Sequence, residues 1–175
     1  HVRGTVTVEG SNNIGGLVGN NYGSSSAPAT VTGCSVSGNV TVKGTGVTVG
    51  IGGVIGYNVT GKVTACRFQG KLAVSGGSSG SMGGVVGYNS TVMKVDESAI
   101  IACYANCEFE SHPTFTGGVV GTHDKYGSSK LTACYSIVAS SKDIVGGVCA
   151  ATGEFINACF WEKSGVDNYP QHGIH

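Results

Sequence analysis

The side chains best suited to chemistry in this sequence are its seven cysteines. Thiolates hold zinc, and thiols in oxidising compartments form disulfides, so their spacing decides between these uses. The sequence has no Cys-x-x-Cys pair, and five cysteines recur every 25 to 37 residues: Cys34, Cys66, Cys103, Cys134 and Cys159. This spacing favours a column of buried, reduced thiols, with one or two disulfide bridges as the alternative. We expect no metal site and no cofactor.

Paired carboxylates are the side chains that cleave a polysaccharide, one as the acid and the other as the base or nucleophile. The acidic residues do not recur at a shared position of the sequence repeat, and the best pair is Asp96 and Asp124. This pair supports an alternative function as a polysaccharide-acting enzyme, either a lyase or a glycoside hydrolase. The sequence lacks His-Glu-x-x-His, Gly-x-Ser-x-Gly and the glycine-rich calcium nonapeptide. We therefore predict that the chain is not an enzyme and treat both aspartates as candidate binding residues.

The residue after each repeated cysteine is aromatic in three of five cases. Tyr104, Tyr135 and Phe160 stand at this position, together with Ser35 and Arg67. If the cysteine points inward on a strand, the next side chain points outward. The sequence therefore predicts a partial aromatic stripe, whose rings stack either on sugar rings or on one another. Tyr104 and Tyr135 are the candidate binding residues of this stripe.

Two alternating sequence markers define the elements that would position these residues. The first is Gly-Gly-apolar-apolar-Gly, which recurs every 29 to 37 residues, at 15–19, 52–56, 83–87, 117–121 and, in degenerate form, 146–150. The second is a four-residue segment that ends in a small residue and Cys, and a strand with alternating pattern follows it. A unit of this size cannot bury its own apolar face, but stacked units can. The sequence predicts an all-β parallel β-solenoid (β-helix) of about five turns, with roughly three short strands per turn.

The predicted solenoid spans residues 1–165, with an incomplete first turn, and residues 166–175 form a C-terminal tail or connector. Of 175 residues, 31 are Gly and only 20 are charged (10 Lys+Arg and 10 Asp+Glu), and Val, Thr and Ser are abundant, which is typical of an all-β chain. An antiparallel sandwich is the alternative fold. The absence of Asn-Gly and Asp-Gly hairpin dipeptides disfavours it.

Three local expectations follow from the repeat. The small residue before each cysteine marks a bend that returns the cysteine to the core. Consecutive apolar residues of the Gly-Gly segment, such as Leu17 and Val18, point to opposite faces. One of their two columns then lies outside, covered by a neighbouring segment or free for lateral contact with another domain or copy. The asparagines after the segment, Asn21, Asn58 and Asn89, form a ladder of turns.

Insertions in the sequence repeat all fall between the Gly-Gly segment and the cysteine, at 22–29, 92–98 and 124–129. In a solenoid they would gather along one edge, and loops on a rigid scaffold often bind ligands. We take this edge as the preferred binding region, with tolerated variation in loop length as the alternative.

Charge and hydropathy limit the partners. The chain has no net charge and only two arginines, so we expect no nucleic-acid partner. No apolar run has the length needed to cross a bilayer, so we expect no membrane span in this fragment. Residues 1–14 match the last third of a unit. We therefore expect further domains of the same polypeptide before His1.

The segments GGLVGNN, GGVIGYN and GGVVGYN, with the cysteine segments between them, resemble the repeats of the GLUG-motif family. These repeats occur in bacterial surface adhesin-like proteins and beside the protease domains of some secreted IgA-cleaving enzymes. The resemblance covers about residues 4–165, and it departs from the pattern at His123, Thr152 and Cys149. It implies an extracellular or cell-surface bacterial β-helix used in attachment.

Our main hypothesis is therefore a non-catalytic adhesin-like or structural repeat module that presents loops on one edge to a host surface protein or glycan. A third hypothesis, ice binding through a flat Thr array, is suggested by Thr5 and Thr7. It requires Thr-x-Thr in every turn, and units three to five lack it.

Overall fold

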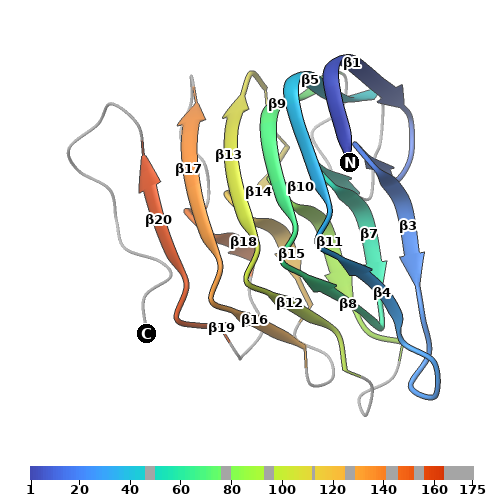
Figure 1. The fold of residues 1–175 in the computed structure, drawn as a ribbon. Helices are drawn as coiled ribbons and strands as arrows, with labels where there is room; N and C mark the ends of the chain where they lie inside the picture. The colour runs from blue at the N-terminus through green and yellow to red at the C-terminus, as the bar shows by residue number, and fades with distance from the viewer. Residues whose placement is uncertain are drawn as a thin grey trace.

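The computed structural model describes residues 1–45, 50–75, 80–92, 97–111, 113–124, 129–140, 146–151 and 156–163. In these ranges every regular element is a β-strand, and every strand pair is parallel. Each turn of chain passes through four sheets in the same order, and the next turn lies beside it in near-constant register (Figure 1). The fold is the predicted parallel β-solenoid.

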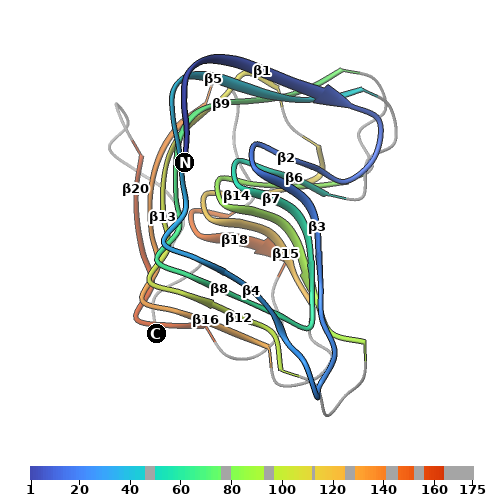
Figure 2. The ribbon, with the colours of Figure 1, turned by 45° about the vertical axis from the view of Figure 1, so that its right-hand side comes forward.

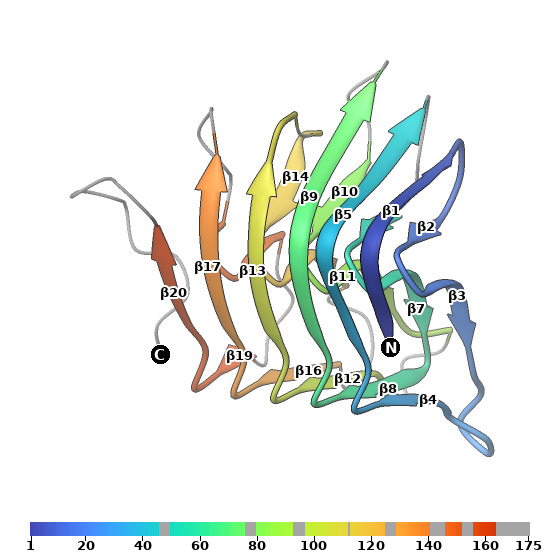
Figure 3. The same cartoon turned by 45° about the horizontal axis from the view of Figure 1, so that its top comes forward.

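Sheet A forms the broad outer wall of the solenoid, where its strands lie side by side (Figure 3). Its strands in spatial order are β1 (Val2–Gly10), β5 (Ser35–Thr45), β9 (Arg67–Ser75), β13 (Tyr104–Phe109), β17 (Tyr135–Ser140) and β20 (Phe160–Lys163). Sheet B contains β14 (Phe115–Gly117), β10 (Ser81–Gly83), β6 (Gly50–Gly52) and β2 (Ile14–Gly15).

Sheets C and D complete each turn. Sheet C contains β18 (Cys149–Ala151), β15 (Val120–His123), β11 (Val86–Ser90), β7 (Ile55–Val59) and β3 (Val18–Tyr22). Sheet D contains β19 (Ile156–Asn157), β16 (Lys130–Thr132), β12 (Ala99–Ile101), β8 (Gly61–Thr64) and β4 (Ala29–Thr32). The predicted domain limit at residue 165 lies outside the described residues.

A full turn has four strands where the sequence predicted roughly three, because the Gly-Gly segment bends and divides between sheets B and C. In the second turn β6 ends at Gly52 and β7 begins at Ile55. A Cβ on Gly52 would overlap the carbonyl oxygen of Ile55, and a Cβ on Gly53 would overlap the Phe68 ring and the carbonyl oxygen of Gly84. Both glycines are therefore fixed by close approach of neighbouring chain, and the motif marks a corner of the solenoid.

The expectation that one apolar column of this segment lies outside is wrong. Val54 and its neighbour Ile55 are both 0% exposed, and the equivalent pairs of the third and fourth turns are equally buried. The bend allows consecutive side chains to point inward. Sheet B also runs beneath the upper part of sheet A, which contacts β2 and β6 (Figure 2). Only the first turn departs, with Leu17 36% exposed.

The bend before each cysteine is confirmed. Gly33 has φ +64°, and the equivalent alanines have φ between 50° and 54°: Ala65, Ala102, Ala133 and Ala158. This left-handed residue turns the chain from sheet D into sheet A and directs the following cysteine inward. Four of the five repeated cysteines are buried, and Cys34 is half-buried.

The thiol column is confirmed as well. None of the seven cysteines, all of which lie in the described ranges, forms a disulfide. Hydrogen bonds with the Cys103 sulfur, together with burial, raise the pKa of Cys66 and of Cys134. Burial also raises the pKa of Cys107. Cys66, Cys107 and Cys134 therefore stay protonated at neutral pH, whereas hydrogen bonds with Cys134 lower the pKa of Cys103 and of Cys159. All five are buried and serve as core side chains.

Candidate functional site

The predicted aromatic stripe lies on the outer face of sheet A. Tyr104 and Tyr135 are partners in the β13–β17 register, with Arg67 next to Tyr104 and Phe160 next to Tyr135. The two tyrosine rings stack on one another, with centroids 5.8 Å apart and an interplanar angle of 17°. Of the two uses predicted for the stripe, ring-on-ring stacking is therefore the one present here, and sugar binding by these tyrosines stays a prediction.

Hydrogen bonding fixes one end of this stripe. The Tyr135 hydroxyl donates to the Glu162 carboxylate at 2.8 Å, and this hydrogen bond raises the pKa of Tyr135. Beyond Tyr135, the Phe160 side chain is 56% exposed. An exposed aromatic ring on a rigid strand remains available to a partner at this end of sheet A.

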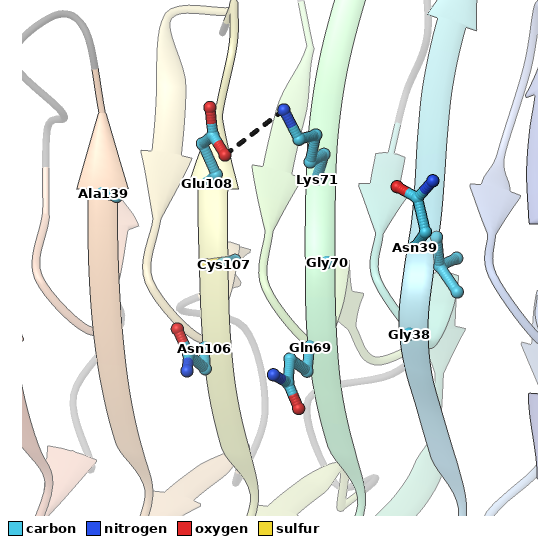
Figure 4. A pocket seen from close by; sticks show the side chains of 10 residues that line it. Gly38, Asn39, Gln69, Gly70, Lys71, Asn106, Cys107, Glu108 and Ala139 are labelled. Atoms are coloured by element: carbon cyan, nitrogen blue, oxygen red, sulfur yellow. Dashed lines mark ion pairs between the residues drawn. The ribbon is translucent and has the colours of Figure 1, made fainter. Parts of the chain in front are cut away.

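The same outer face is hollowed beside the aromatic stripe, over β5, β9 and β13 (Figure 4). The hollow has a volume of about 290 Å³ and is lined mainly by polar side chains and glycine backbone: Gly38, Asn39, Val40, Gln69, Gly70, Lys71, Asn106, Cys107, Glu108 and Ala139. Asn39 and Gln69 are exposed and Asn106 is half-buried. We name this feature the sheet A hollow.

A bulge in β5 creates the sheet A hollow. The register between β5 and β9 pairs Val36 with Phe68 and then Thr41 with Lys71, so β5 has extra residues in this interval. Gly38, inside the bulge, has φ +113°, which favours glycine. Across from the bulge, a Cβ on Gly70 would lie 2.5 Å from the Val40 carbonyl oxygen and 3.0 Å from the buried Phe68 ring, so the two strands approach closely here and the position requires glycine.

The charged groups at one side of the hollow pair with one another. The Lys71 ammonium lies 3.4 Å from the Glu108 carboxylate and 2.9 Å from the Glu110 carboxylate. Hydrogen bonds to Glu110 and then Glu108 raise the pKa of Lys71, so this group is protonated at neutral pH. The cluster carries one positive and two negative charges and does not favour an anionic ligand.

The insertions begin and end along one edge, because each joins a strand of sheet C to a strand of sheet D; of the three, the structure describes 22–29 in full. The second turn crosses this edge through the single residue Thr60, at φ 48°, while the first turn crosses through residues 23–28. The two turns and Glu97 of the third enclose a groove of about 190 Å³ lined by Ser24, Ser25, Pro28, Thr60, Lys62 and Glu97. We name it the insertion-edge groove.

The two aspartates predicted for this edge are not brought together by what the structure describes. Asp96 lies outside the described residues. Asp124 follows β15, and its carboxylate accepts a hydrogen bond from the Ser90 hydroxyl at 2.9 Å. Asp124 does not line the insertion-edge groove. The described contacts therefore give it a structural role between neighbouring turns.

The asparagine ladder exists, but the predicted role in turns is wrong. Asn21, Asn58 and Asn89 lie within strands of sheet C, have no positive φ, and are at most 8% exposed. The Asn21 amide donates to Asn58, and the Asn58 amide donates to Asn89, both at 2.6 Å. Asn89 then contacts the Nδ1 atom of His123 at 3.0 Å. The ladder is a buried network that joins four turns. Alternation of inward and outward side chains along these strands could have indicated from the sequence that the asparagines are buried.

A second tyrosine pair, which the sequence analysis missed, lies on sheet C. Tyr57 and Tyr88 are half-buried partners in register, and their rings meet edge to face with centroids 5.3 Å apart. Both follow the last glycine of the Gly-Gly segment, so the repeated Gly-Tyr-Asn was the available signal.

Two further expectations concern metals and membranes. Among the ranges that the structure describes, no group of three or more His, Cys, Asp or Glu side chains is placed to hold a metal ion. In the same ranges, no helix has the length and apolar character required to span a bilayer.

The fold and its repeated corners define a β-solenoid repeat module of the β-helix type. The family model of the GLUG motif matches residues 10–41, which include the first Gly-Gly corner, β3, β4 and Cys34. The predicted resemblance to GLUG-motif repeats is therefore confirmed for the first turn. Comparison with curated proteins and comparison with solved structures gave no match.

Proposed function

We propose that the chain is a non-catalytic, adhesin-like repeat module of an extracellular or cell-surface bacterial protein. In this proposal the rigid solenoid presents the insertion edge to a partner, either a host surface protein or a glycan. The GLUG motif at residues 10–41 supports the repeat-module part of the proposal. The attachment role, the location and the bacterial origin are proposed from the resemblance.

The observation that carries the proposal is the gathering of variable connections on one edge. Residues from three successive turns line the insertion-edge groove. The connections of these turns differ in length and in residue type, whereas the strands of the four sheets recur in every full turn. Lys62 and Glu97 bring one charge of each sign to the groove. A scaffold that repeats and an edge that varies are typical of binding by loops on a rigid frame.

The enzymatic alternative rests on Asp96 and Asp124. Asp124 accepts a hydrogen bond from the Ser90 hydroxyl at 2.9 Å, and Asp96 lies outside the described residues. A polysaccharide-cleaving site needs an acid and a base or nucleophile on opposite sides of one bond. We therefore keep the non-catalytic proposal, and product analysis tests it against the alternative.

Adhesion of host cells to the immobilised chain tests the proposal. We expect cells to adhere to the wild-type chain and expect adhesion to fall when residues 23–28 are replaced by a single Thr, the length that the second turn uses at this edge. Thr30→Ala, an exposed change on β4, is the matched control and should adhere like the wild type. Equal adhesion of the loop-shortened variant would contradict the role of the edge. Release of oligosaccharides from a glycan, abolished by Asp124→Asn, would contradict the non-catalytic assignment.

A further inference from the structure

The sheet A hollow contains hydrogen-bonding groups that the fold does not use. Among the described residues, the side-chain amides of Asn39, Gln69 and Asn106 make no hydrogen bond with the protein. They lie on three adjacent strands and line the same hollow, and Figure 4 shows Gln69 and Asn106 side by side at the same level of β9 and β13. Each amide offers both donor and acceptor atoms. The hollow thus presents, on each of three neighbouring strands, one side-chain amide with both a donor and an acceptor atom.

We propose that the sheet A hollow binds one or two rings of a neutral oligosaccharide. A sugar hydroxyl both donates and accepts hydrogen bonds, so adjacent hydroxyls of one ring match amides that do the same. The floor adds Gly70 backbone and the small side chain of Ala139, against which the C–H face of a ring packs. This inference rests on the proposed binding function and assigns a ligand class to a different surface of the module.

Charge selects a neutral sugar over an acidic one. Lys71 is the basic residue that lines the hollow, and its ammonium group forms ion pairs with Glu108 and Glu110. The three groups sum to one negative charge, which repels uronic-acid and sialylated glycans at low ionic strength.

The size of the hollow limits the affinity. Its volume of about 290 Å³ lies at the lower end of small-molecule sites, which span about 300–1,000 Å³. An open site of this kind leaves much of the ligand in water. We therefore expect a dissociation constant on the order of 1 mM for a single chain, with tighter attachment arising when many copies bind one surface.

Amide spectra of the isotope-labelled full chain test the proposal directly. The probes are neutral hexose oligosaccharides (cello-, malto-, manno- and galacto-hexaose), and the acidic comparison is a hexamer of galacturonate. We expect at least one neutral probe to shift the side-chain amide signals of Gln69 and Asn106, and the acidic probe to leave them in place. Gln69→Ala and Asn106→Ala should each weaken this binding by about tenfold. Asn20→Ala, an exposed amide on β3 of sheet C, is the matched control and should bind like the wild type.

The spectra of the variants report their folding, so loss of binding is separated from loss of structure. The proposal is overturned if no neutral probe shifts these signals at about tenfold its expected dissociation constant, if the acidic probe binds there instead, or if both alanine variants bind like Asn20→Ala. Cell adhesion that depends on residues 23–28 without any of these shifts would leave the attachment function in place and refute only the sugar site.

Discussion

The buried asparagine ladder gives the sharpest energetic prediction, because its central member, Asn58, has no exposed surface. Its carboxamide oxygen accepts from Asn21, and its nitrogen donates to Asn89 at 2.6 Å and to Ser98 and the Gly61 carbonyl at 3.0 Å. Replacing Asn58 by Ala removes all four hydrogen bonds together. We therefore expect a large loss of stability from a single polar residue.

The magnitude follows from which partners stay satisfied. In Asn58→Ala, the single Ser98 hydroxyl proton can still be donated to Asn89 at 2.6 Å, with the Gly61 carbonyl at 3.1 Å as its alternative acceptor. The Asn21 amide keeps only the Ala29 carbonyl at 3.4 Å. One poorly satisfied buried amide costs about 1–3 kcal/mol, and the unfilled space adds to it. We expect Asn58→Ala to lower the free energy of unfolding by about 2–4 kcal/mol.

Urea unfolding followed by circular dichroism measures this loss, with Asn20→Ala as the matched control. Asn20 is exposed and makes one hydrogen bond, to Asn13, so its removal should cost less than about 0.5 kcal/mol. A double-mutant cycle of Asn58→Ala with Asn89→Ala should give a coupling energy of about 1 kcal/mol. Equal effects of Asn58→Ala and Asn20→Ala, or a coupling energy near zero, would refute the reasoning.

Three further predictions concern corner glycines, titration and thiols. Gly53→Ala should destabilise the fold by about 3 kcal/mol or more, because its Cβ would overlap the Phe68 ring and backbone. Gly33→Ala should cost about 1 kcal/mol, because nothing lies within 4 Å of its Cβ. Similar melting temperatures for the two variants would contradict the corner geometry. Burial lowers the pKa of His123, so the unfolded state binds a proton first as pH falls below about 6.5, and the free energy of unfolding should decrease there. His123→Asn, which introduces the residue of the three preceding turns, should reduce this pH dependence in urea titrations at about pH 5 to 7. An unchanged pH dependence would show that other groups cause it. Cys34 should react first with a thiol reagent in the native protein and the six buried cysteines only on unfolding, as counted by mass spectrometry; several fast thiols would contradict the buried column.

Much of the fold was predictable because stacked turns place equivalent residues in one environment. The sequence repeat shows which residues become neighbours in successive turns, so no separate information on long-range contacts is needed. The repeated features are the Gly-Gly segment and the cysteines Cys34, Cys66 and Cys103. The bend before each cysteine was also predictable, since Val63 and Cys66 are three residues apart and both are buried. Only a turn between them satisfies both facts.

The parts that failed depend on packing between sheets, which a repeat pattern does not encode. Val54 and Ile55 are both buried because the chain bends between sheets B and C at this segment, and strand alternation alone predicts that one is outside. Asn58 was assigned to a turn from its usual preference, while its hydrogen-bond partners are residues 31 and 37 positions away. Tertiary context here overrides local preference.

The candidate sites divide in the same way. The insertion edge was visible as variation in repeat length, and the outward position of Tyr104 followed from the inward position of Cys103. The sheet A hollow was not predictable, because it lies where the bulge at Gly38 shifts the register of β5 against β9. A register shift between two strands has no signature in either strand alone.

Proton–proton contacts between side-chain amides in nuclear magnetic resonance spectra test the central claim, the parallel in-register stacking of turns, most directly. We predict cross-peaks that link the amide of Asn58 with those of Asn21 and Asn89, and Asn89 with the ring of His123. Absence of these cross-peaks, together with the close Hα–Hα contacts of antiparallel strand pairs, would contradict it.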